Sequence, residues 1–197
     1  MDAASLAALV TKIDQSERDG RGLPPVERWN PPDCGPIPMR IASDGTWFYE
    51  GTPIGRAPLV RLFSTVLRRE ADGTYVLVTP IEKLTIEVED APFLAVAMEV
   101  KGEGHDQTIN LRTNVGDKIA VGSDHPLRFD AGDGTAELKP YAHVRGGLEA
   151  LVGRAVMYDL VELGEEIEKD EAPIFAVRSR GTVFPIMPMA ELNRLTR

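Results

Sequence analysis

Short runs of alternating apolar and polar residues, separated by turns rich in glycine, proline and aspartate, dominate this 197-residue chain from Met39 onward. A period of two is typical of a strand with one buried face and one exposed face. Leu84, Ile86 and Val88, for example, alternate with polar residues, and Ser43-Asp44-Gly45 is a hairpin turn signal. The pattern predicts antiparallel sheets with few and short helices.

Two predicted helices and an irregular arm interrupt this strand pattern. Apolar residues recur at helical spacing between residues 3 and 15, which predicts an N-terminal helix. Residues 16–38 are rich in proline and glycine, so they are expected to form an irregular arm. Pro58 is typical of the start of a helix, and the apolar residues that follow it predict one buried helix face.

Composition and charge exclude several classes of protein. The chain has 31 acidic and 22 basic residues, and a net charge of −9 argues against a nucleic acid strand as partner. The hydrophobic fraction of 43% is too high for a disordered chain. The single cysteine, Cys34, excludes a disulfide framework and a cysteine-rich zinc site. No apolar run is long enough for membrane insertion and no secretory signal is present, so a cytoplasmic location is expected.

A weak internal repeat indicates a duplicated domain. When the chain is shifted by 89 residues, six of the 24 positions from Asp44 to Leu67 are identical. The matches are Asp44-Gly45-Thr46 with Asp133-Gly134-Thr135, Arg56 with Arg145, Leu59 with Leu148, and Leu62 with Leu151. We therefore predict a strand-dominated α+β fold with two similar antiparallel-sheet halves, each with one short helix. The expected divisions are an arm at 1–38, a first repeat domain with connecting strands at 39–122, and a second repeat domain at 123–197. The acidic segment 162–171 is expected to be a solvated hairpin loop inserted into the second copy.

A set of motifs spread over most of the chain carries a family resemblance. The motifs are Trp29-Asn30-Pro31, Asp44-Gly45-Thr46-Trp47-Phe48-Tyr49, Gly51-Thr52-Pro53-Ile54-Gly55-Arg56, Thr79-Pro80-Ile81-Glu82-Lys83, Thr113-Asn114-Val115-Gly116-Asp117 and His125-Pro126-Leu127-Arg128. From Trp29 to about Tyr158 the chain resembles the bacterial domain-of-unknown-function family 1285. That resemblance implies a duplicated domain whose second copy is superficially like a pleckstrin-homology fold. It also implies a nucleotide-like ligand at the interface between the copies and a role in signal transduction.

Five residues are candidates for binding an anionic ligand. Arg56 and Arg145 take matching places in the repeat, and the guanidinium fork suits a phosphate, although an internal ion pair explains each arginine equally well. Lys83 would hold an anion if it faces a groove, the alternative being a solvated loop. Trp47 and Tyr141 are candidates for stacking on a base, and burial in the core is the alternative for Trp47.

The sequence offers no recognisable catalytic or metal-binding pattern. Ser123, Asp124 and His125 are consecutive, so their side chains cannot converge as a catalytic triad. His105, His125 and His143 lack the spacing of metal ligands. Catalytic residues, metal ligands and cofactors are therefore predicted to be absent.

These observations favour a cytoplasmic, non-enzymatic ligand-binding or regulatory protein. The expected partner is a small anionic, nucleotide-like molecule between the two halves, with a role in signal transduction. One alternative is a protein-interaction module or a homodimer formed through exposed strand edges. Another is a hydrolase, which would require His125 or His143 to be hydrogen-bonded to a carboxylate inside a cleft.

Overall fold

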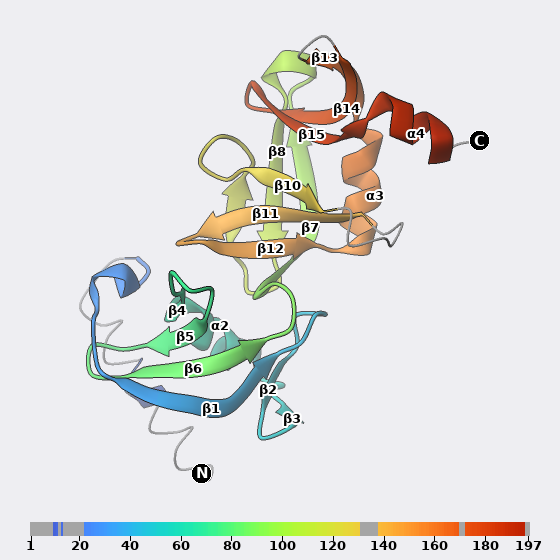
Figure 1. The fold of residues 1–197 in the computed structure, drawn as a ribbon. Coiled ribbons are helices and arrows are strands. Elements are labelled where there is room, and N and C mark those ends of the chain that lie inside the picture. The colour runs from blue at the N-terminus through green and yellow to red at the C-terminus, as the bar shows by residue number, and fades with distance from the viewer. Residues whose placement is uncertain (1–9, 12, 14–21, 131–137, 170–171, 196–197) are drawn as a thin grey trace. The chain divides into compact units, whose positions relative to one another are not determined.

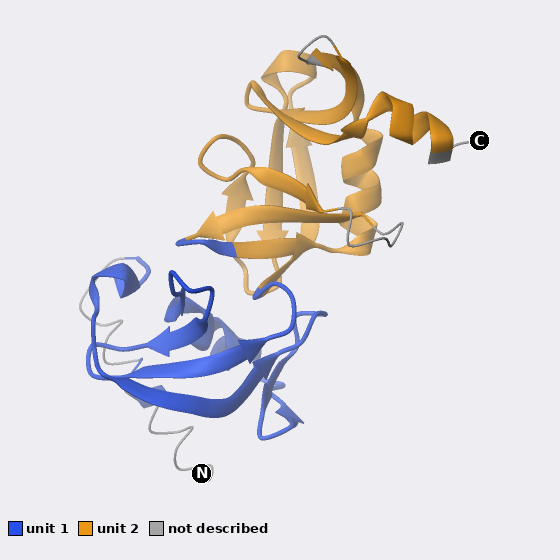
Figure 2. Cartoon of the chain, viewed as in Figure 1, with its two compact units in different colours: residues 1–92, 146–148 blue, residues 93–145, 149–197 orange. Residues whose placement is uncertain are grey.

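The chain folds into two compact units, which are described separately. The computed structural model describes residues 10–11, 13, 22–130, 138–169 and 172–195. Unit 1 comprises residues 1–92 and 146–148, and unit 2 comprises residues 93–145 and 149–197 (Figure 2). This division precedes the expected boundary at 122–123, because the strands between Phe93 and Ala120 pair into the same sheet as a strand at Leu148–Val152.

Unit 1 contains a six-stranded sheet and a nine-residue α-helix, α2 (Figure 1). The strands are hydrogen-bonded in the order β3-β2-β1-β6-β5-β4. The elements are η1 (Val26–Arg28), β1 (Asp33–Ile41), β2 (Trp47–Tyr49), β3 (Thr52–Pro53), α2 (Ala57–Thr65), β4 (Leu67–Arg69), β5 (Tyr75–Val78) and β6 (Lys83–Val88).

Unit 2 contains a second six-stranded sheet, ordered β10-β11-β12-β7-β8-β9, and a separate three-stranded sheet, β13-β14-β15 (Figure 1). The elements are β7 (Phe93–Lys101), η2 (Gly104–Asp106), β8 (Thr108–Thr113), β9 (Lys118–Ala120), β10 (Leu127–Asp130), β11 (Lys139–Arg145), β12 (Leu148–Val152), α3 (Arg154–Glu162), β13 (Glu165–Lys169), β14 (Ala172–Ser179), β15 (Thr182–Pro188) and α4 (Met189–Leu195). None of the helices described in either unit is long and apolar enough to cross a bilayer.

The two six-stranded sheets share one topology, which confirms the predicted duplication. Each sheet consists of two three-stranded meanders joined where the first strand pairs with the last. This central pair is parallel in both units, β1 with β6 and β7 with β12. The helices are placed differently, since α2 lies between the two meanders of unit 1 whereas α3 follows the last strand of the second sheet.

The residue correspondence expected from the shift of 89 is wrong. Leu59 and Leu62 lie in α2, but Leu148 and Leu151 lie in strand β12. The cause is the pair Gly146-Gly147, whose φ angles of 50° and 73° make a tight turn between β11 and β12. Two consecutive residues with positive φ form the hairpin turn that matches the twist of the flanking strands. Shared topology places β7 and β12 in the positions of β1 and β6, so the copies are related through different residues.

Most local predictions are confirmed. The turn at Ser43-Asp44-Gly45 joins β1 to β2, and Asp44 Oδ1 accepts a hydrogen bond of 2.9 Å from the Thr46 N–H. Pro58 lies in the first turn of α2, and Phe63 on the apolar face of that helix is fully buried. Most of the predicted N-terminal helix lies outside the described residues, but residues 10, 11 and 13 are helical.

Within the acidic segment 162–171, residues 165–169 form a strand and not part of the solvated loop that we expected. Glu165–Lys169 form β13, an edge strand that pairs with β14. Arg178 Nε donates a hydrogen bond of 3.0 Å to Glu165 from the neighbouring strand. Charged residues on an edge strand prevent it from pairing with other chains, so the acidic residues here protect the sheet.

Arg68 fixes the irregular arm to the sheet of unit 1. This buried side chain donates hydrogen bonds of 2.8 and 2.7 Å to the carbonyls of Val26 and Trp29. Its Nη2 lies 2.6 Å from Glu70, so the guanidinium charge is paired as well as hydrogen-bonded. One residue of β4 therefore satisfies two carbonyls of a segment that has little regular structure of its own.

Replacing Arg68 with Met tests this anchor. We expect a loss of about 2–4 kcal/mol in the free energy of unfolding, because two carbonyls lose their donor and Glu70 keeps only its contact with Lys83. Chemical denaturation measures the effect. Arg69→Met is the matched control, since Arg69 is the exposed next residue of the same strand and should change stability by about 0.5 kcal/mol or less. Equal losses in the two variants would contradict the anchoring role.

Two aspartates should make the stability of unit 1 sensitive to acid. Main-chain hydrogen bonds from Thr46 and Thr74 lower the pKa of Asp44 and Asp72 respectively. A pKa that is lower in the folded state stabilises the fold at neutral pH, and this contribution is lost as the pH falls below about 4 and then through the folded value. Melting temperatures measured between pH 7 and 2 should therefore fall less steeply in Asp44→Asn/Asp72→Asn than in the parent. Parallel curves would show that these turns do not titrate with folding.

Candidate functional site

In unit 1 the expected ligand residues have different environments. Trp47 is 1% exposed, and its ring stacks on Phe63 with centroids 6.2 Å apart. Lys83 is half-buried, with Nζ 3.4 Å from Glu70. Arg56 is exposed immediately before α2 and forms no ion pair with any residue the structure describes. Thus Trp47 is a core residue here, Lys83 is paired, and Arg56 alone has its charge open to solvent.

In unit 2 both expected residues are engaged by neighbouring side chains. Arg145 Nη1 donates a hydrogen bond of 2.6 Å to Asp117, and its guanidinium lies 5.0 Å from the centre of the Phe93 ring. Tyr141 is 6% exposed and is covered by Arg128, whose guanidinium carbon lies 3.9 Å from the ring centre. The internal ion pair, one of the two alternatives for Arg145, is the arrangement present.

Arg128, which covers Tyr141, is itself fixed by Glu149. Its Nε and Nη2 donate hydrogen bonds of 2.7 and 2.8 Å to the two carboxylate oxygens of Glu149. These bonds raise the pKa of Arg128. A bidentate pair of this kind holds the guanidinium over the ring, so the face of Tyr141 that could stack on a base is already occupied.

His125 and His143 form a stacked pair that differs from the arrangement a hydrolase would need. Their ring centroids are 6.0 Å apart. Each Nδ1 lies 3.1 Å from a main-chain carbonyl, that of His143 for His125 and that of Asp124 for His143. Neither histidine bonds a carboxylate in the described part of the chain. The hydrogen bond to a carboxylate that a hydrolase would require of His125 or His143 is therefore not formed among these residues. No cluster of three or more metal-ligating side chains occurs among those residues either.

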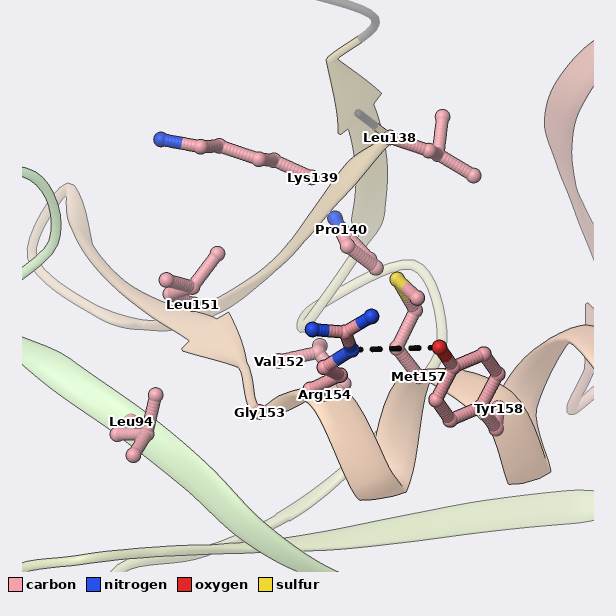
Figure 3. A pocket seen from close by; sticks show the side chains of 10 residues that line it. All are labelled: Leu94, Leu138, Lys139, Pro140, Leu151, Val152, Gly153, Arg154, Met157 and Tyr158. Atoms are coloured by element: carbon pink, nitrogen blue, oxygen red, sulfur yellow. Dashed lines mark hydrogen bonds between the residues drawn. The ribbon is translucent and has the colours of Figure 1, made fainter. Parts of the chain in front are cut away.

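A groove of about 710 Å³ lies in unit 2 and is large enough for a small molecule (Figure 3). Leu94 from β7 and Leu151 from β12 line one side of it, Pro140 at the start of β11 lines another, and Met157 and Tyr158 contribute from α3. A volume between about 300 and 1,000 Å³ with a mainly apolar lining is typical of small-molecule sites. The groove is therefore of suitable size and character for a compact organic ligand.

The way β12 passes into α3 creates this groove. Leu151 pairs with Leu94 in the parallel β12–β7 ladder. The Gly153 N–H then donates to the Ala95 carbonyl at 2.9 Å, which extends the ladder to the start of the helix. A Cβ at Gly153 would lie 3.0 Å from that carbonyl oxygen, so glycine allows the close approach. The next residue is Arg154, which thus stands at the edge of the groove.

Two cations give the groove its electrostatic character. Lys139 and Arg154 line it, and Arg154 Nε donates a hydrogen bond of 3.2 Å to the Tyr158 hydroxyl (Figure 3). No Asp, Glu, His, Ser or Cys is found among its described lining residues. The first turn of α3 also carries no acidic residue. An apolar floor with a cationic edge is suited to an organic anion whose body is apolar or aromatic.

Lys139 and Arg154 are not among the residues expected from the sequence, although one signal in the sequence indicates them. Gly-Gly between runs of alternating residues is a hairpin signal. If Gly146-Gly147 is interpreted as a hairpin turn, residues 148–152 are predicted to form a strand and the second helix is predicted to start after Gly153. Lys139 and Arg154 then fall near each other, since the β11–β12 hairpin brings the residues at its two open ends together.

These observations define a two-unit, strand-dominated α+β protein with a duplicated six-stranded sheet and an apolar, cation-edged groove in its second unit. Residues 24–91 match the N-terminal domain of DUF1285, described as a domain of unknown function. Residues 92–186 match the C-terminal domain of DUF1285, described as a protein of unknown function. The chain belongs to the DUF1285 family, and the junction between the two family domains lies within one residue of the division after Pro92.

Two solved structures are similar to this chain. A DUF1285 family protein from Silicibacter pomeroyi DSS-3 is 47% identical, covers 92% of this chain and 98% of its own, and superposes with a TM-score of 0.82. A DUF1285 family protein from Shewanella baltica OS155 is 30% identical, covers 64% of this chain and 91% of its own, and has a TM-score of 0.51. No curated protein matches the chain.

The different environments of Arg145 and Arg56 lead to a stability test. Arg145→Gln should lower the free energy of unfolding by about 1–3 kcal/mol, because the half-buried Asp117 loses its partner. Arg56→Gln should change it by about 0.5 kcal/mol or less, since its side chain is exposed. Urea denaturation of the two variants measures the difference. A loss in Arg56→Gln as large as that in Arg145→Gln would show that the two arginines have equivalent structural roles.

Proposed function

We propose that this protein is a non-enzymatic ligand-binding protein whose second unit binds a small organic anion of nucleotide size. The groove beside α3 is the observation that supports the proposal, because it joins an apolar floor to two cations in a chain of net charge −9. A nucleotide combines an aromatic base with phosphates, so it is the first ligand class to test. Binding without catalysis would fit a regulatory role in signal transduction.

Each part of such a ligand has a counterpart in the groove. Leu94, Leu151 and Val152 offer an apolar surface on which a base can be buried. The Arg154 guanidinium can form two parallel hydrogen bonds to a phosphate, whereas Lys139 acts as a point charge. The described lining side chains include neither a carboxylate nor a histidine to act as general base, which favours binding over hydrolysis.

Thermal shift and calorimetry with adenosine and guanosine mono-, di- and triphosphates test the proposal. A ligand present at 100 times its Kd should stabilise the protein by about 2.7 kcal/mol, which corresponds to several degrees in melting temperature. Arg154→Gln should weaken binding by about tenfold or more, because one charge-assisted contact is lost. Uncharged adenosine and the aliphatic carboxylate decanoate serve as comparison ligands.

Arg56→Gln is the matched control for this experiment, since it removes an exposed arginine that precedes the other helix. It should leave nucleotide binding unchanged. Binding that is lost in Arg56→Gln and retained in Arg154→Gln would reject the groove as the site. Stabilisation by decanoate alone would reject a nucleotide as the ligand, and the absence of stabilisation by any anion would reject the proposal as a whole.

A further inference from the structure

A second hollow lies on the exposed face of the β7–β8–β9 meander, and it is distinct from the groove beside α3. Its volume is about 400 Å³. The strand register places Arg112 of β8 directly between Ala97 of β7 and Lys118 of β9. Arg112 and Lys118 are both exposed, whereas Leu111 and Ile119, which alternate with them, are buried on the opposite face. The two cations thus project from the same side of the sheet at the same register.

Two exposed cations at directly opposed positions of neighbouring strands repel each other. Directly opposed residues of an antiparallel pair have Cβ atoms about 4.5–5.5 Å apart, and like charges at such positions are destabilising. Neither Arg112 nor Lys118 forms an ion pair within the described residues. The carboxylate that lines this hollow, Glu99, is paired with Lys101 instead, at 3.6 Å from its Nζ.

The surroundings of the two cations leave space for an anion and supply further donors. Ala97 has a short side chain beside Arg112, which opens the hollow between longer neighbours. Asn110, two residues before Arg112, lies on the same face and can donate from its amide. Lys101 lines the far end of the hollow, where its Nζ is 3.6 Å from Glu99.

We propose that this face is a binding site for a phosphate group, held between Arg112 and Lys118. The guanidinium fork matches two phosphate oxygens and the ammonium contributes a mobile point charge. A bound dianion neutralises the opposed cations, so binding removes a repulsion that exists in the free protein. The hollow is larger than a phosphate, which gives space for the esterified part of a phosphate monoester.

Two sources of the phosphate are distinguished by the probes used. Isothermal calorimetry and thermal shift at constant ionic strength compare inorganic phosphate and glycerol 3-phosphate with chloride. Co-sedimentation compares phosphatidylcholine vesicles with and without phosphatidic acid. We expect the soluble phosphates to raise the melting temperature and chloride to leave it unchanged. Binding only to phosphatidic acid vesicles would assign the same phosphate chemistry to a lipid headgroup, provided that it depends on Lys118.

Lys118→Gln gives two effects of opposite sign. Without phosphate the variant should melt at the same temperature as the parent or slightly higher, because a repulsion has been removed. With phosphate its stabilisation should be lost, with a Kd weakened by about tenfold or more. Arg112→Gln should behave in the same way. Glu99→Gln removes an acid from the edge of the same hollow and should tighten binding slightly.

The controls separate this site from the groove. Arg154→Gln should leave phosphate binding at Arg112 and Lys118 intact, and Arg61→Gln, an exposed arginine of α2, should have no effect. A phosphate response that is unchanged in both Lys118→Gln and Arg112→Gln would overturn the proposal, as would the absence of binding by every phosphate probe. Loss of the response only in Arg154→Gln would assign the phosphate to the groove and overturn this second site.

Discussion

The parallel pairing of the first and last strands of each six-stranded sheet is the constraint on which both units depend. Parallel neighbours cannot be joined by a tight turn, and here their connection consists of all the other strands of the sheet. Without the β7–β12 pair, unit 2 would be left with two separate meanders and exposed strand edges. The same pair places the Gly153 N–H within hydrogen-bond distance of the Ala95 carbonyl. It therefore also determines where α3 begins and where the groove forms.

Features carried by neighbouring residues could be predicted from the sequence, whereas features that depend on distant pairing could not. Asp44 stabilises its turn by accepting a hydrogen bond from the Thr46 N–H two residues away, and a short sequence motif is enough to predict such a contact. The pairing of β1 with β6 joins residues about 50 positions apart, and no local sequence pattern predicts this pairing. Leu148 and Leu151 are three residues apart, a spacing that favours a helix. In β12, however, Leu148, Ala150 and Val152 are buried in alternation, which is the period of a strand.

The candidate site shows the same limit for side chains. Arg145 finds its partner Asp117 across 28 positions, and a single sequence cannot reveal which acid among 31 will lie beside a given arginine. The stacking role expected of Trp47 and Tyr141 rests on residue type, on the predicted strand at Trp47 and on the family resemblance. Burial of the indole against Phe63 and cover of the phenol ring by Arg128 are properties of the packed units. Residue type indicated which groups could bind a ligand, and packing decided which of them are engaged by the protein itself.

The distribution of charge in this chain is compatible with the two anion sites proposed for an acidic protein. At physiological ionic strength, charges separated by more than about 8 Å are largely screened. The groove has Lys139 and Arg154 at its edge, and the face of β8 and β9 presents Arg112 and Lys118, while Glu99 at the edge of that second hollow lies beside Lys101. The glutamates of β13 lie on an edge strand, where their repulsion protects the sheet from pairing with other chains. The net charge of −9 is therefore a property of the protein as a whole. The sign of the charge that a bound ligand can carry depends on the few charged residues within a screening length of the ligand.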